Sequence, residues 1–266
     1  MPKIEANGIQ LYYELHGRAD DPVLVLSNGV LMSTASWAFQ TPALAKHFRL
    51  LLYDCRGMWQ SDHPPGPYSM ELHADDLACL LDSLGIERAH IGGTSYGAEV
   101  SLVFALKYPE RTQSLLVTSA VSQVLPQLEG IINAWDTAAT SHDSELLFEL
   151  VYPITFSNEW IGANQKVLAD ARERYKKLDF DAFHELLMAF QKLNVTGEIK
   201  NISAPTLVVV GEHDMLKPRM YDEIIAAEIP GAEFAVIPNA GHAAMWEQPG
   251  IFNSLVIGFV TKHADR

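Results

Sequence analysis

The sequence has 266 residues, a length that fits one α/β domain with an insertion or two small domains. Of these residues 48% are hydrophobic and 20% are charged, so the chain can build a large core and is not disordered. Acidic residues outnumber basic ones by 33 to 19, which gives a formal net charge of −14. This balance argues against nucleic acid or an anionic membrane as a partner, since both require clustered Lys and Arg.

Short apolar runs recur along the chain and predict a buried sheet. Segment 9–17, IQLYYELHG, alternates polar and apolar residues as an antiparallel edge strand does. Later runs are apolar throughout and end in small or turn-forming residues: VLVLS (23–27), LLLY (50–53), AHIGG (89–93), SLLVTS (114–119), TLVVVG (206–211) and FAVIP (234–238). Strands that are apolar on both faces are typical of a parallel sheet covered by helices.

Amphipathic stretches separate these runs and predict the covering helices. They span 69–85, 98–110, 220–229 and 250–263. The first has a candidate N-cap in Ser69 and a stop signal in Gly85. Alternating strands and helices are the pattern of a doubly wound α/β sheet.

The rhythm breaks between residues 122 and 200, where no strand-like run occurs and the sequence is helical and rich in aromatic residues. We expect a helical cap insertion over 122–200 within a core domain formed by 1–121 and 201–266. Most of the aromatic side chains should form the core of the cap itself. Those predicted to contact a substrate are Trp135, Phe156 and Trp160, since such a cap can bury an apolar acyl or aryl group.

The stretch HIGGTSYGAEV, residues 90–100, places Ser95 between Gly93 and Gly97. A buried strand precedes it and a helix follows. In a G-x-S-x-G turn the small neighbours allow a strained backbone that exposes the serine hydroxyl at the carboxyl end of the sheet. We interpret Ser95 as a nucleophile; an ordinary tight turn is the alternative.

A serine nucleophile needs a base, and the base needs a carboxylate that fixes its tautomer. The strand TLVVVG leads into EHD, which predicts Asp214 as the acid, although Glu212 and His213 flank it. The strand FAVIP leads into NAGH, which predicts His242 as the base. Both residues follow strand ends in the order Ser, Asp, His that this turn requires. Each alone could instead be a helix cap or a solvated loop residue.

An oxyanion site requires two backbone N–H groups near the nucleophile. One is expected from Tyr96, which directly follows Ser95. The other is expected from Val30 in the loop NGVLMSTASW after the first buried strand, where Gly29 permits an unusual backbone. Neither prediction depends on a side chain.

The motifs GTSYG, GEHD and NAGH resemble those of the α/β-hydrolase superfamily over nearly the full chain. That resemblance implies a mostly parallel central sheet flanked by helices, with a helical cap insertion. The segments DDPVLVLSNGVLMSTASW and HFRLLLYDCRG resemble the 3-oxoadipate enol-lactonase and esterase group, and the N-terminal tract also resembles 3-hydroxyacyl transferases of the same fold.

Two residues depart from the common pattern of the superfamily and are candidates for substrate contact. In DCRGMWQSD, Trp59 replaces the second glycine of the usual D-x-R-G-x-G-x-S loop. Its indole could lie near the mouth of the site or simply cover the edge of the sheet. Asn28 stands where most relatives have histidine at the start of the oxyanion loop.

The sequence predicts a hydrolase that cleaves a small carboxylic ester or lactone through an acyl-serine. The alternatives are an acyltransferase and a ligand-binding member of the fold. An uncharged substrate is expected, because the acidic field disfavours a dicarboxylate lactone unless arginines intervene. The candidate arginines are Arg56, Arg172 and Arg174. An oxidoreductase is excluded because no G-x-G-x-x-G follows the first buried strand.

No targeting or cofactor signal accompanies these motifs. The N-terminal MPKIEANGIQLYYE has no apolar stretch of a signal peptide, and no run approaches the roughly 18 apolar residues of a membrane span. Cys55 and Cys79 give no disulfide framework, and the histidines form no HxxxH or HxH pair. We expect a soluble cytoplasmic protein without metal or other cofactor, and a homo-oligomer is compatible with the sequence.

Overall fold

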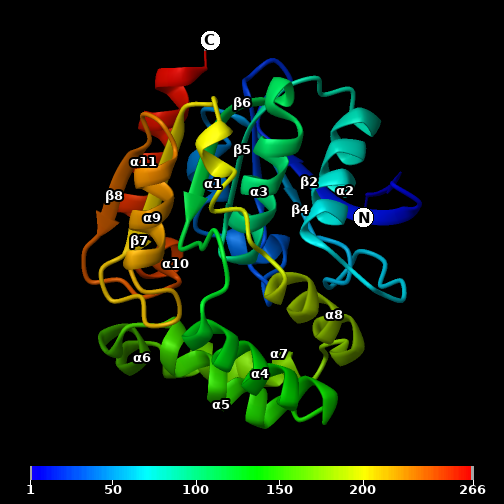
Figure 1. Cartoon of the computed structure of the whole chain (residues 1–266), viewed down its shortest axis with the longest axis vertical. Helices are drawn as coiled ribbons and strands as arrows, with labels where there is room; N and C mark the ends of the chain where they lie inside the picture. Colours follow the sequence, from blue (N-terminus) through cyan, green and yellow to red (C-terminus); the bar gives the residue numbers. More distant parts are fainter. Residues whose placement is uncertain (1, 265–266) are drawn as a thin grey trace.

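The computed structural model describes residues 2–264. Within them eight strands form one sheet, and a layer of helices lies below one end of the strands (Figure 1). The strands are β1 (Lys3–Ala6), β2 (Ile9–His16), β3 (Val23–Ser27), β4 (Arg49–Tyr53), β5 (Ala89–Thr94), β6 (Thr112–Thr118), β7 (Thr206–Gly211) and β8 (Glu233–Ile237). Their order is β1-β2-β4-β3-β5-β6-β7-β8. The predicted mostly parallel sheet is confirmed, because every neighbouring pair from β4 to β8 runs parallel.

The N-terminal end of the sheet differs from the sequence prediction in one respect. Strand β2 pairs antiparallel with β4, as its alternating pattern predicts. The edge position, however, belongs to β1, which pairs antiparallel with β2. Strand β1 is only four residues long, KIEA, with Lys3 and Glu5 exposed, so it lacks the apolar run that marks a strand in sequence.

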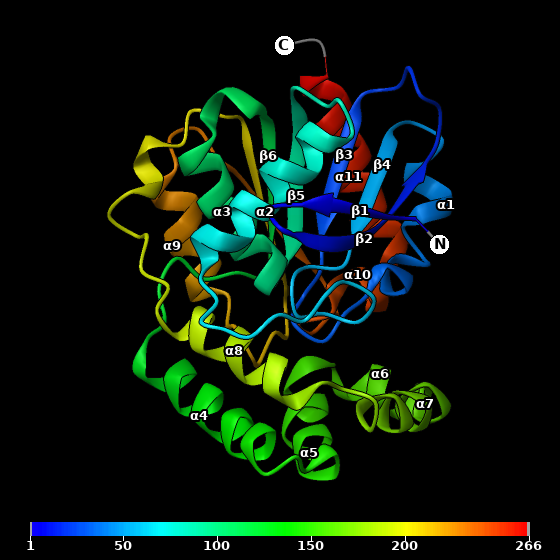
Figure 2. The ribbon, with the colours of Figure 1, turned by 90° about the vertical axis from the view of Figure 1, so that its right-hand side faces the viewer.

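Helices cover both faces of the sheet (Figure 2). The helices α2 (Met70–Ser83), α3 (Tyr96–Lys107) and α9 (Met220–Glu228) share one hydrophobic core, and α1 (Thr41–Leu44), α10 (Ala244–Glu247) and α11 (Pro249–His263) share the other. Successive strand residues serve opposite cores: Val25 packs with the first group and Leu24 with the second. The short 3-10 turns are η1 (Thr34–Trp37), η2 (Pro109–Arg111) and η3 (Ile199–Asn201).

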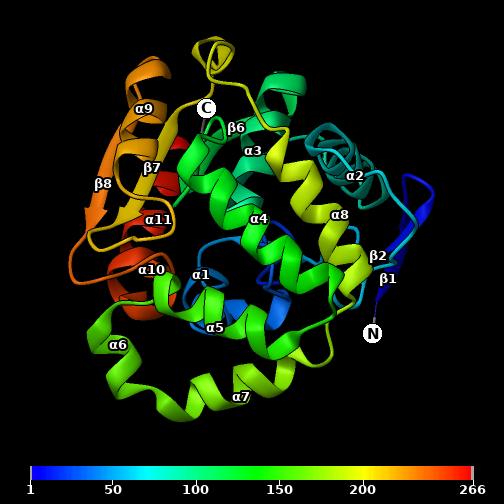
Figure 3. The ribbon, with the colours of Figure 1, turned by 60° about the horizontal axis from the view of Figure 1, so that its bottom comes forward.

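A helical insertion lies between β6 and β7, as predicted. It contains α4 (Pro126–Thr140), α5 (Ser144–Thr155), α6 (Asn158–Ala163), α7 (Gln165–Tyr175) and α8 (Phe180–Gln191). These helices form a layer below the carboxyl ends of the parallel strands, and Figure 3 looks onto that layer. The insertion therefore covers the carboxyl ends of the strands, where Ser95 and the loops after β7 and β8 lie. Its limits at 122 and 200 stay a prediction.

Candidate active site

Ser95 lies on a strained turn between β5 and α3. Its φ of 52° and ψ of −123° are conformations that residues other than glycine rarely adopt. A Cβ added to Gly97 would lie 2.2 Å from the carbonyl oxygen of Ser27, and one added to Gly93 would lie 2.4 Å from the backbone of Gly97. The two glycines are therefore required because backbones approach closely here, which an ordinary turn would not demand.

Asp214 and His242 lie in the loops after β7 and β8 and form a buried pair. His242 Nδ1 donates to Asp214 Oδ2 at 2.8 Å, and the two side chains are 8% and 0% exposed. The other carboxylate oxygen, Oδ1, accepts from the backbone N–H of Lys217 at 2.8 Å. The carboxylate thus fixes the imidazole with its proton on Nδ1, which leaves Nε2 unprotonated as a base requires.

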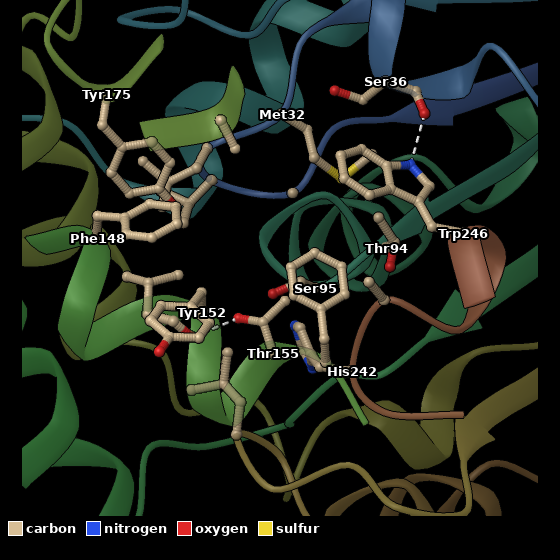
Figure 4. A pocket seen from close by; sticks show the side chains of 18 of the residues that line it. Met32, Ser36, Thr94, Ser95, Phe148, Tyr152, Thr155, Tyr175, His242 and Trp246 are labelled. Carbon is tan, nitrogen blue, oxygen red and sulfur yellow. Dashed lines mark hydrogen bonds between the residues drawn. The ribbon is translucent and has the colours of Figure 1, made fainter. Parts of the chain in front are cut away.

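A cavity between core and cap brings Ser95 and His242 together, and both line its wall (Figure 4). It encloses about 890 Å³ of space between protein atoms, its opening included. The wall is mainly apolar and aromatic; examples are Met32, Trp135, Phe148, Tyr152, Tyr175 and Trp246. Within residues 2–264 no hydrogen bond joins Ser95 Oγ to His242, and such bonds are often long until substrate binds.

The two residues predicted to supply oxyanion N–H groups lie beside the nucleophile. Met32 N donates to Gly29 O at 2.9 Å, so residues 29–32 form a tight turn with Val30 at its first central position. Val30, Ser95 and Tyr96 border one small cavity next to the main one. This placement is compatible with two N–H groups converging on one oxygen.

Asn28, which the sequence predicts to contact substrate, does not line the cavity. Its side chain is fully buried and uses both of its ends: Nδ2 donates to Asp54 at 3.0 Å, and Oδ1 accepts from Trp37 Nε1 at 2.7 Å. Asp54 also accepts from the backbone N–H of Thr34 at 2.9 Å. Asn28 therefore holds the loop that carries Val30.

The four predicted aromatic contacts divide in two groups. Trp59, Trp135 and Phe156 line the cavity. Trp160 does not line it; its ring stacks on Phe156 with the centroids 4.1 Å apart and supports that side chain from behind. Trp246 does line the cavity and was missed, although its place four residues after His242 in NAGHAAMW could have identified it.

The three candidate arginines differ in their partners. Arg56 is buried against Asp76, to which its Nη2 donates at 2.6 Å. Arg172 forms ion pairs with Glu145 and Glu149 on α5. Only the third candidate, Arg174, lines the cavity, which leaves the other two with structural roles.

A buried ion pair lies directly behind the proposed acid and was not foreseen. Lys217 Nζ donates to Glu99 Oε1 at 2.7 Å, and the side chains are 2% and 0% exposed. Burial raises the pKa of Glu99, which Lys217 opposes. The partners are 118 positions apart, so no local pattern links them. Because Glu99 lies one turn after Ser95, the pair joins the nucleophile helix to the loop of Asp214.

Between residues 2 and 264, no group of three or more His, Cys, Asp or Glu side chains is arranged to hold a metal ion. No helix in that range combines the length and apolar character needed to cross a bilayer.

The comparison with protein families agrees with this geometry. The family described as the alpha/beta hydrolase fold matches residues 22–249. The chain belongs to the α/β-hydrolase family. The matched range includes Ser95, Asp214 and His242 together with the helical insertion between them.

The chain is also similar to individual hydrolases in sequence and in structure. The chain is 30% identical to the "Putative carbamate hydrolase RutD" of Caulobacter sp. (strain K31) over 267 residues, covering 96% of this chain and 97% of that protein. The enol-lactonase from Burkholderia xenovorans LB400 superimposes with a TM-score of 0.92 at 28% identity, covering 98% of this chain and 100% of that one. An esterase from Thermogutta terrifontis gives 0.89 at 26% identity, with 98% of both chains covered.

These findings confirm the predicted fold and the predicted similarity to enol-lactonases and esterases. This α/β-hydrolase is accordingly a hydrolase whose relatives act on esters, lactones or, by name, carbamates.

Proposed function

We propose that this α/β-hydrolase cleaves a carboxylic ester or lactone through an acyl-enzyme on Ser95. The observation that carries the proposal is the shared cavity: a serine on a strained turn and a histidine held by a buried aspartate line the same apolar wall. The relatives named for lactone and ester substrates support the same chemistry.

The reaction assigns one role to each residue. His242 Nε2 takes the proton of Ser95 Oγ as that oxygen attacks the substrate carbonyl, and Asp214 stabilises the imidazolium that forms. The backbone N–H groups of Val30 and Tyr96 bind the tetrahedral oxyanion. His242 then gives the proton to the leaving oxygen, and a water activated by the same nitrogen cleaves the acyl-serine.

The name of the RutD relatives adds carbamates to the substrates worth testing. A carbamate presents a carbonyl between nitrogen and oxygen, and the same nucleophile and oxyanion groups could act on it. A matched set of p-nitrophenyl ester, aryl carbamate and lactone of equal size separates these classes by their kcat/KM values.

The test of the catalytic role is intact-mass analysis after fluorophosphonate treatment, with p-nitrophenyl butyrate turnover measured in parallel. We expect one adduct and turnover in the wild type, and loss of the adduct with at least about a 10⁴-fold drop in kcat in Ser95→Ala. Ser254→Ala, an exposed serine on α11, is the matched control and should retain both.

Other outcomes would change the assignment. Labelling that persists in Ser95→Ala would contradict the nucleophile. A folded wild type with neither adduct nor turnover would favour a ligand-binding protein. Ester formation from an added alcohol at the expense of hydrolysis would identify an acyltransferase.

A further inference from the structure

Arg174, on the last turn of α7, introduces a positive charge into the wall of an apolar cavity. Among the described residues that line this cavity there is no Asp, Glu or Lys; the only other titratable cation is His242. In a chain with a net charge of −14, a cavity whose one permanent charge is positive is an exception that needs a physical reason.

In the part of the chain that the structure describes, no carboxylate forms an ion pair with this arginine, and Asp54 acts on it only through its charge at longer range. Its Nη2 donates to Ser33 Oγ at 2.8 Å, and its guanidinium lies 4.1 Å from the centre of the Trp59 ring. Neither contact supplies a negative charge. A guanidinium has five N–H donors, so most of its capacity is left for a ligand.

Two other buried cations in this molecule, in contrast, form ion pairs with carboxylates. Arg56 pairs with Asp76, and Lys217 pairs with Glu99. Burial lowers the pKa of Arg174; the charge of the Asp54 carboxylate opposes this shift but does not offset the loss of water around the cation. A desolvated and unpaired charge is unfavourable, and a bound anion would relieve the cost.

The platform under Arg174 is itself a departure from the family pattern. Trp59 stands where the resemblance predicts glycine and keeps a left-handed φ of 44° that favours glycine. Its Nε1 donates to the carbonyl oxygen of Leu31 at 3.3 Å, which fixes the indole against the oxyanion loop. Strained backbone of this kind is characteristic of ligand sites, and here it places an aromatic face against a cation.

We propose that Arg174, supported by Trp59, binds a carboxylate on the substrate at a position other than the scissile carbonyl. The preferred substrates are then esters or lactones with an apolar body and one carboxylate. A carboxylate fits because the planar guanidinium can bind both of its oxygens at once. The inference rests on the proposed hydrolase function and names the substrate class for the same site.

The experiment compares charged and neutral esters of matched length. Release of p-nitrophenolate is measured from the monoesters of adipate, pimelate and suberate and from the corresponding neutral hexanoate, heptanoate and octanoate esters, with spontaneous hydrolysis subtracted. We expect the wild type to prefer one of the charged esters by about 10- to 100-fold in kcat/KM, the effect of one charge-assisted hydrogen bond. The preferred length reports the spacing between Arg174 and Ser95.

Three variants assign the preference to this arginine. Arg174→Gln should reduce the ratio of charged to neutral kcat/KM by about 10- to 100-fold, and Arg174→Lys should retain part of it. Arg172→Gln, on the same helix but paired with Glu145 and Glu149, should leave the ratio unchanged. A wild type that prefers the neutral esters, or equal losses on both esters in Arg174→Gln, would overturn the proposal.

A failure of the carboxylate site can be distinguished from a failure of the proposed hydrolase function. If wild-type turnover survives Ser95→Ala, the hydrolase mechanism fails whatever the ester ratio is. If turnover requires Ser95 and the ratio does not respond to residue 174, only the carboxylate site fails. Should Arg174→Gln not fold, competitive inhibition of the wild type by hexanoate but not by hexanol supports the site, and equal inhibition overturns it.

Discussion

The core and the cap of this hydrolase treat buried cations differently. In the core, Lys217 lies against Glu99 and Arg56 against Asp76, each within 2.7 Å of a carboxylate oxygen. On the cap, Arg174 lines the cavity and contacts a hydroxyl and an indole without forming an ion pair among the described residues. In the core pairs each cation has a carboxylate partner without any ligand, and the pairs hold elements together. The cap cation has no such partner, which is expected of a group that binds a ligand.

The largest effect that tests this contrast is expected from Lys217→Met. The variant leaves Glu99 buried and without its cation, which should lower the free energy of unfolding by about 3–5 kcal/mol in urea at pH 7. The double variant Glu99→Gln with Lys217→Met should recover much of the loss, because no unpaired charge then remains. A loss below about 1 kcal/mol in the single variant would show that the pair is not structural.

Asp54 tests the same comparison with a buried anion. It accepts hydrogen bonds from Asn28, Thr34 and Gln60 but forms no ion pair within residues 2–264, and burial raises its pKa to about 6. The ordinary value is near 3.8, so the protonated form is the one favoured by folding. Its contribution to stability is complete below pH 4 and is lost as pH rises through 6, a total of about 3 kcal/mol.

The measurement is the free energy of unfolding of the wild type and of Asp54→Asn at several pH values from 4 to 7. The difference, wild type minus variant, should fall by about 3 kcal/mol across that range. The variant also changes the group that faces Gln60 N, so its stability at any single pH is not the readout. Parallel pH profiles of the two proteins would contradict the raised pKa.

The sequence predicted those parts of the fold and of the site that depend on residues close together in the chain. Strands buried on both faces are apolar throughout, and the loops that follow them place Ser95, Asp214 and His242 at one edge. The helical insertion was recognisable because the strand rhythm stops. The strands, the loops and the insertion are each determined by neighbouring residues, so periodicity and spacing are sufficient to predict them.

Other features depend on contacts between distant segments and could not be predicted in this way. Asn28 looked like a substrate contact because of its place in the oxyanion loop, yet Asp54 and Trp37 take up its whole side chain. Trp160 and Trp135 looked equivalent in sequence, but only Trp135 lines the cavity. Which face a cap residue turns toward the core is set by helix packing, which leaves no signal at a single position.

The smallest effect, and the one that most directly separates cap from core, is expected from Arg174→Met. Removing this cation ends a desolvation cost, but it also ends the contact with Trp59 and one hydrogen bond to Ser33, each a modest contribution. These terms oppose each other, so the free energy of unfolding should change by less than about 1 kcal/mol. Arg56→Met is the matched arginine control, and its free energy of unfolding should fall by about 3–5 kcal/mol, because Asp76 would remain buried without its cation. Equal losses in the two variants would place Arg174 among the structural cations and remove the reason to assign it to a ligand.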